Sequence, residues 1–167
     1  AGQGLLAIAA AEAAAMGMSS KEILTLLDEM RPQTRVIAVA NDLSFAVKGG
    51  RVPAIVKKIT EFLHINPVLT ASPEGKMTLG GFHRGRGARP VALARTAVRK
   101  MQKNVVYRVM VTHMNNEEGA AETRRNILQK HGRIHSCHLS EAGPALGVHL
   151  GSGGIIVGFM PQPPLLV

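Results

Sequence analysis

The most informative stretch of the chain is GPALGVHLGSGGIIVGF, residues 143–159, which also contains the first candidate site. The end of this stretch, IIVGF at 155–159, is a short apolar run typical of a buried strand. Before it, His149 stands among glycines, which let a backbone approach a ligand closely and point its amides at it. The pattern fits an anionic head group at the mouth of an apolar pocket. A glycine-rich turn with a solvated histidine also fits it.

Composition limits the possible partners and compartment. The chain has 167 residues, enough for a domain with its own core, and with four Phe, one Tyr and no Trp that core must be aliphatic. The net charge of +9 favours anionic partners: nucleic acid, acidic proteins, lipid head groups or carboxylates. One cysteine excludes an internal disulfide and is compatible with a reducing, cytoplasmic compartment. No apolar run is long enough to span a membrane.

The order of predicted elements indicates an α+β fold. Two helices near residues 3–16 and 21–33 form an N-terminal hairpin, the first ending at Gly17 and the second capped by Ser19 or Ser20. Strands are predicted at 35–40, 67–70, 76–79, 105–113, 134–140 and 155–159, and helices at 52–64, 90–103 and 116–130. Because one strand pair is a tight hairpin, we expect a two-layer α/β arrangement with a mixed, roughly six-stranded sheet.

These elements suggest three segments. We expect residues 1–34 to be the helical hairpin, 35–160 the α+β domain and 161–167 a flexible, proline-rich tail.

A basic loop predicted at 83–89, HRGRGAR, is the second candidate site. Arginine forks such as those of Arg84 and Arg86 grip carboxylate or phosphate in a bidentate manner, although a solvated loop fits as well. This loop supports an alternative function, a nucleic-acid or acidic-protein binding module. The aromatic side chains that stack on bases are nearly absent, which weakens the nucleic-acid version. Arg51 follows two glycines and is either a cation near a ligand or a charged residue of a helix's first turn.

The sequence offers neither a metal centre nor a catalytic set. On a strand, His135 and Cys137 point to one side and His138 to the other, so they cannot converge on one ion. No nucleophile elbow, Walker-type loop or dinucleotide fingerprint is present, and Asp42 and Glu141 are isolated carboxylates.

Segments along nearly the whole chain resemble, in order, the DegV family of fatty-acid-binding proteins. They are AGQGLLAIAAAEAAAMGMSSKEI (1–23), AVANDLSFAVKGGRV (38–52), INPVLT (65–70) with EGKM (74–77), HRGRGA (83–88) and EAGPALGVHLGSGG (141–154). The resemblance is to the C-terminal half or more of a DegV protein. The chain also lacks a starting Met, so we expect it to be a piece of a longer protein whose N-terminal α/β domain is missing here. We expect the helical hairpin of residues 1–34 to pack on that domain.

The resemblance implies a two-domain carrier that encloses a long-chain fatty acid between its domains. The carrier presents the carboxylate to a separate kinase, which forms the acyl phosphate for phospholipid metabolism. The protein is then no enzyme and needs no cofactor, its ligand being the fatty acid and its partners the kinase and the N-terminal domain. Methionines such as Met77, Met110 and Met114 suit a tunnel for varied acyl chains. A distant likeness to dihydroxyacetone kinases leaves an enzymatic alternative, with His149 as nucleophile.

The resemblance also assigns residues to the fatty-acid site. The family's histidine motif matches His149, with Gly147 and Gly151 as its flanking glycines and Ser152 where the family usually has proline. Its GGR turn and basic segment match three arginines that face the head group or the kinase: Arg51, Arg84 and Arg86. The family's carboxylate-binding Ser and Thr lie in the N-terminal domain, so we expect only half of the head-group site here.

Overall fold

The computed structural model describes residues 1–40, 43–50, 53, 55–56, 58, 65–72, 75–85 and 89–164. Within these ranges, the strands are β1 (Arg35–Val39), β2 (Ile65–Ala71), β3 (Met77–Arg84), β4 (Tyr107–His113), β5 (Ile134–Glu141) and β6 (Ile155–Pro161). The helices are α1 (Gly2–Ala15), α2 (Ser20–Met30), α3 (Ser44–Lys48), α5 (Arg89–Lys100), α6 (Glu117–Lys130) and α7 (Pro144–Leu150), with a 3₁₀ turn at Arg31–Gln33. The helix predicted at 52–64 falls largely outside the described residues.

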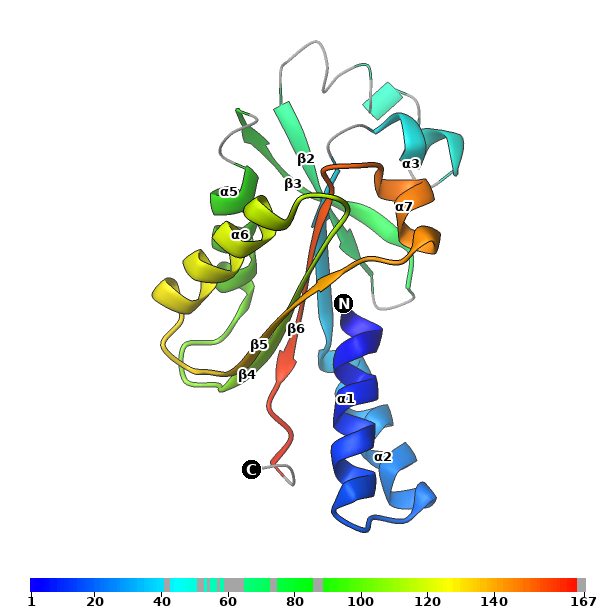
Figure 1. Cartoon of the computed structure of the whole chain (residues 1–167), viewed down its shortest axis with the longest axis vertical. Helices are drawn as coiled ribbons and strands as arrows, with labels where there is room; N and C mark the ends of the chain where they lie inside the picture. The colour runs from blue at the N-terminus through cyan, green and yellow to red at the C-terminus, as the bar shows by residue number, and fades with distance from the viewer. Residues whose placement is uncertain are drawn as a thin grey trace.

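The strands form one mixed sheet in the order β3-β2-β1-β6-β4-β5. Only the β4–β5 pair is parallel, and the other four pairs are antiparallel. The predicted α+β fold with a six-stranded mixed sheet behind a helical hairpin is confirmed. Helices lie on both faces of the sheet (Figure 1), where a two-layer arrangement predicts one covered face.

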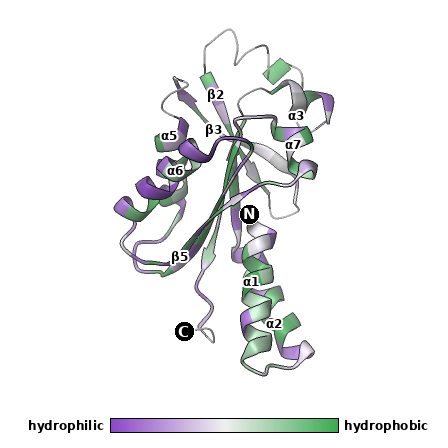
Figure 2. Ribbon diagram, viewed as in Figure 1, coloured by the Kyte–Doolittle hydropathy of each residue, from purple (hydrophilic) through white to green (hydrophobic). Residues whose placement is uncertain are grey.

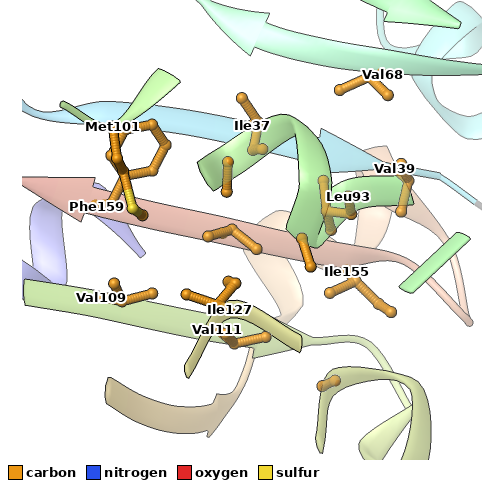
Figure 3. Close-up of a cluster of buried hydrophobic side chains, with 14 of the residues drawn as sticks. Ile37, Val39, Val68, Leu93, Met101, Val109, Val111, Ile127, Ile155 and Phe159 are labelled. Carbon is orange, nitrogen blue, oxygen red and sulfur yellow. The ribbon is translucent and has the colours of Figure 1, made fainter. Parts of the chain in front are cut away.

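Strand β6 is central because it pairs with both β1 and β4. Its odd-numbered residues Ile155, Val157 and Phe159 face α5 and α6, where they pack with Leu93 and Ile127 (Figure 3). Its even-numbered residues face the other way: Ile156 packs near α3 and α7, and Met160 packs under α1 and α2. One strand therefore contributes to all three apolar clusters.

Glycine lets helix α1 lie directly on β6. A Cβ placed on Gly158 would lie 2.8 Å from the backbone N of Gly2 and 2.9 Å from the backbone C of Ala1. On the helix side, a Cβ on Gly4 would lie 2.9 Å from the Met110 sulfur. Figure 2 shows α1 as hydrophobic along most of its length, in keeping with this close packing.

The hairpin predicted at 1–34 thus packs on the sheet of this same domain, and its contact with an N-terminal domain stays a prediction. The second helix begins with the predicted cap: the Ser19 hydroxyl accepts from the Glu22 amide, and the Glu22 carboxylate accepts from the Ser19 amide. At the other terminus, the Gln162 amide donates to the Val106 carbonyl at 2.8 Å, and residues 165–167 lie outside the described residues.

A buried cation joins the hairpin to the sheet. Arg108, on β4, is only 2% exposed. Its Nη1 donates to the carboxylate of Glu12 on α1, and its Nε donates to the side-chain oxygen of Gln162 after β6. A buried guanidinium left without its carboxylate would be costly, so Glu12 anchors α1 on the sheet.

We predict that Glu12→Ala destabilises the protein by about 3 kcal/mol, because it leaves the Arg108 charge buried without its carboxylate. The matched control is Arg31→Ala, which removes the exposed 3.4 Å ion pair with Asp28 and should cost under about 1 kcal/mol. Urea unfolding measures both changes. Equal losses of stability in the two variants would contradict this role of Glu12.

Candidate functional site

One end of the sheet gathers the candidate residues. Strand β6 begins here at Ile155, which pairs with the last residues of β1 and β4, Val39 and His113. The last residue of β5, Glu141, pairs with His113 at the same end. Helices α3 and α7 contact each other there, at the top of Figure 1. A ligand at this end would meet the segments before β6 and after β4.

His149 lies in the last turn of the seven-residue helix α7, so the prediction of a glycine-rich loop around it is wrong. Pro144 at the start of the helix presets a helical φ, and Gly151 ends it with a φ of +68°. Gly147 lies inside this helix, where a Cβ would lie 2.7 Å from the Cε at the end of the flexible Met114 side chain. Gly147 is therefore a helix residue and not a loop glycine.

The imidazole of His149 has an unsatisfied buried atom. Its Nδ1 is inaccessible to solvent and has no hydrogen-bond partner in the described part of the chain. A buried polar atom without a partner costs roughly 1–3 kcal/mol, so a group that hydrogen-bonds to it would be favoured. This atom is a candidate contact for a polar head group.

The turn after α7 supplies further donors. Gly151 and Gly153 have φ values of +68° and +88°, which L side chains rarely adopt. Ser152, between them, is exposed, and its amide makes no backbone hydrogen bond within the described ranges. Its hydroxyl accepts a long, 3.5 Å bond from Asn115. The Ser152 amide and hydroxyl could therefore donate to an anion.

The segment that holds this turn, residues 113–116, is not among the site residues predicted from the sequence. The Gly153 amide donates to the Met114 carbonyl at 2.7 Å, and the Met114 amide donates to the Gly154 carbonyl at 3.0 Å. The Asn116 side chain adds a 3.0 Å bond to the Gly153 carbonyl. Two successive asparagines between a strand and a helix are the only sequence signal for it, since Asn tolerates positive φ, as Asn115 does here.

The basic loop is shorter than predicted, because His83 and Arg84 belong to β3 and Arg89 begins α5. Arg84 lies on the edge strand β3, where it pairs with Ile65 of β2, and it is exposed. Arg89 donates through Nε and Nη2 to the Asn66 side-chain oxygen at 2.9 and 2.7 Å. Arg51 and Arg86, which the resemblance assigned to the site, lie outside the described residues.

Among the residues whose placement is described, no group of three or more His, Cys, Asp or Glu side chains is suited to a metal. His135 and His138 are exposed on β5, and burial raises the pKa of the half-buried Cys137 thiol between them. In the same described part, no helix combines the length and apolar character needed to cross a membrane.

The fold and this end of the sheet define an α+β domain with a candidate anion site beside a short helix. A family model described as "Uncharacterised protein, DegV family" matches residues 1–162. The chain belongs to the DegV family.

Individual relatives agree with this assignment. A DegV domain-containing protein of Streptococcus pyogenes is 26% identical over 156 residues, which cover 93% of this chain and 53% of that protein. YteA of Lactococcus lactis is 25% identical over 156 residues, with the same coverage of 93% and 53%. The chain spans about half the length of the curated relatives it matches.

Solved structures share the fold. The fatty acid binding DegV family protein SAG1342 from Streptococcus agalactiae superposes with a TM-score of 0.81 at 26% identity, over 97% of this chain and 56% of that one. A stearic-acid-binding protein from Eubacterium ventriosum reaches a TM-score of 0.84 at 21% identity, over 98% and 56%. At that lower identity the likeness concerns the fold alone.

We predict that His83 makes stability depend on pH. Within the described residues, both ring nitrogens of this histidine are buried without hydrogen-bond partners. Burial lowers the pKa of His83 below the ordinary 6.5; the Arg84 backbone acts against this shift, and the positive charge of Arg89 adds to it. The unfolded chain therefore takes up the proton first, and stability falls as the pH drops below 6.5. Urea unfolding between about pH 7.5 and 5 should show a smaller fall for His83→Leu than for the wild type. An unchanged fall in the variant would contradict this.

Proposed function

We propose that the chain is part of a fatty-acid-binding protein and holds the acyl carboxylate beside His149. The observation that carries the proposal is the buried, unpartnered Nδ1 of His149, with the free Ser152 amide in the adjoining turn. A carboxylate removed from water needs such donors to offset its desolvation. Membership of the DegV family and the fatty-acid-binding relative from Streptococcus agalactiae support the choice of ligand.

Apolar side chains near this end of the sheet suit the acyl chain. On α7, Leu146 and Val148 are 39% and 61% exposed, and on β3 Leu79 and Phe82 are 46% and 50% exposed. Leu79 pairs with Leu69, and Phe82 pairs with Pro67, two residues before Leu69 on β2. The Leu69 side chain packs in the cluster that contains Leu150 of α7, so Leu79 and Phe82 point to that face. Each methylene buried against such a surface contributes about 0.8 kcal/mol.

Of the methionines considered for a tunnel, Met114 fits this proposal best. It packs in the apolar cluster near α3 and α7 and lies against Gly147. Met110 lies under α1, against Gly4, and helps to seat the hairpin. The side chain of Met77 is outside the described residues.

The proposal extends from fatty-acid binding to a carrier role. The bound acid is presented to a separate, cytoplasmic kinase, and the exposed Arg84 at the end of β3 is available to the head group or to that partner. Arg51 and Arg86 take the same role by family resemblance. A further domain, packed on the hairpin, supplies the remaining carboxylate ligands. The formation of acyl phosphate then belongs to the kinase.

We predict that His149→Ala weakens oleate binding by about tenfold, the loss of one hydrogen bond to a charged group. Isothermal titration calorimetry of the full-length protein from its host measures the oleate affinity. His138→Ala, which removes an exposed histidine of β5, is the control and should leave the affinity unchanged.

Two results would count against this function. One is the absence of co-purified acyl species in native mass spectra together with no binding on titration. The other is binding to a DNA duplex or to polyglutamate that weakens steeply with salt, which would favour the alternative use of the basic segment. A fatty-acid carrier should lose little affinity between low and moderate salt.

A further inference from the structure

We propose that Asn116 is a positioning residue that sets the place of α7, and through it of His149, by clamping the turn of residues 151–154. The consequence for ligand binding rests on the proposed function, whereas the clamp itself is a property of the fold. The Asn116 side chain makes hydrogen bonds through both the oxygen and the nitrogen of its amide.

The side-chain amide of Asn116 joins the start of α6 to the glycine turn of residues 151–154, which is distant in the sequence. Its Oδ1 accepts from the Gly119 amide at 3.2 Å and so caps α6, while its Nδ2 donates to the Gly153 carbonyl at 3.0 Å. Room for this side chain comes from Gly119, where a Cβ would lie only 2.7 Å from the Asn116 Oδ1. The start of α6 is thus built around an amide that also reaches the glycine turn.

Both ends of α7 are tied to the segment 113–116. Before the helix, the Ala142 amide donates to the His113 carbonyl at 2.8 Å. After it, the Gly153 amide donates to the Met114 carbonyl at 2.7 Å. The segment is itself held by a further bond, because the backbone amide of Asn116 donates to the Nδ1 of His113, a residue that is 8% exposed. The anchor is therefore a well-packed end of β4.

Other contacts of helix α7 are few. Seven residues are too few for a helix to be stable alone, and Leu150 is its only buried residue. Leu150 packs in the apolar cluster that includes Ala46 of α3, and Met114 packs against this cluster. The turn that follows has two glycines with positive φ, whose lack of side chains leaves the backbone to hold it. Together with this packing, hydrogen bonds to the segment 113–116 fix where the His149 imidazole lies.

Asn116→Asp separates this clamp from the helix cap. A carboxylate still accepts from the Gly119 amide, but it cannot donate to the Gly153 carbonyl and places two oxygens face to face. Hydrogen exchange at the Gly153 and Met114 amides should become about tenfold faster while Gly119 stays protected. The NMR signals of the His149 ring should shift, and oleate affinity should fall by about tenfold, as in His149→Ala.

The matched control is Asn126→Asp. Asn126 donates to the Glu122 carbonyl at 2.9 Å, so this variant removes a similar donor from the same helix without touching α7. It should leave the exchange rates, the His149 signals and oleate affinity as in the wild type. If Asn116→Asp fails to fold, Asn116→Ser keeps the cap and removes the side-chain Nδ2 that donates to the Gly153 carbonyl.

Unchanged exchange at Gly153 and unchanged His149 signals in the folded Asn116 variant would overturn the inference. So would the same changes in Asn126→Asp. These two readouts need no ligand, so they still test the clamp if the wild-type protein binds no oleate. That last result would count against the proposed function alone.

Discussion

The antiparallel insertion of β6 between β1 and β4 is the constraint on which the described structure depends. Each of the three apolar clusters contains a residue of this strand, from Ile155 to Met160. Gly158 in its middle lets α1 approach within contact of the backbone, and Arg108 on the neighbouring strand secures that helix through Glu12. Because β6 lies between β1 and β4, the core closes only when residues 155–160 are in place.

The same constraint places the candidate site. Since Ile155 must pair with Val39 and His113, the turn that precedes it has to cross the end of the sheet. Helix α7 and its glycine turn are held there by backbone bonds to the segment after β4. In the proposed function, this arrangement puts the His149 imidazole and the Ser152 amide at the head group and leaves the apolar face of the sheet to the acyl chain.

Local sequence signals predicted most of the elements. The helix cap at Ser19, the helix of residues 117–130 and the apolar strands of the sheet are read from patterns that act within a few residues. The helix around His149 could not be predicted, because its glycine content favours a turn and contacts with a segment some 30 residues earlier stabilise it. The pairing of Arg108 with Glu12, 96 residues apart, is equally invisible to a local pattern. Local patterns made His149 and Arg84 candidates and the family resemblance assigned them to the site, whereas neither signal indicated Asn116 or His113.

A crystal structure of the protein with bound palmitate would show whether the carboxylate lies beside His149. We expect a carboxylate oxygen within about 2.7–3.2 Å of a ring nitrogen of His149 or of the Ser152 amide. We also expect the acyl chain along the apolar face beside α7. A carboxylate bound elsewhere, with His149 facing water in the occupied protein, would contradict this placement.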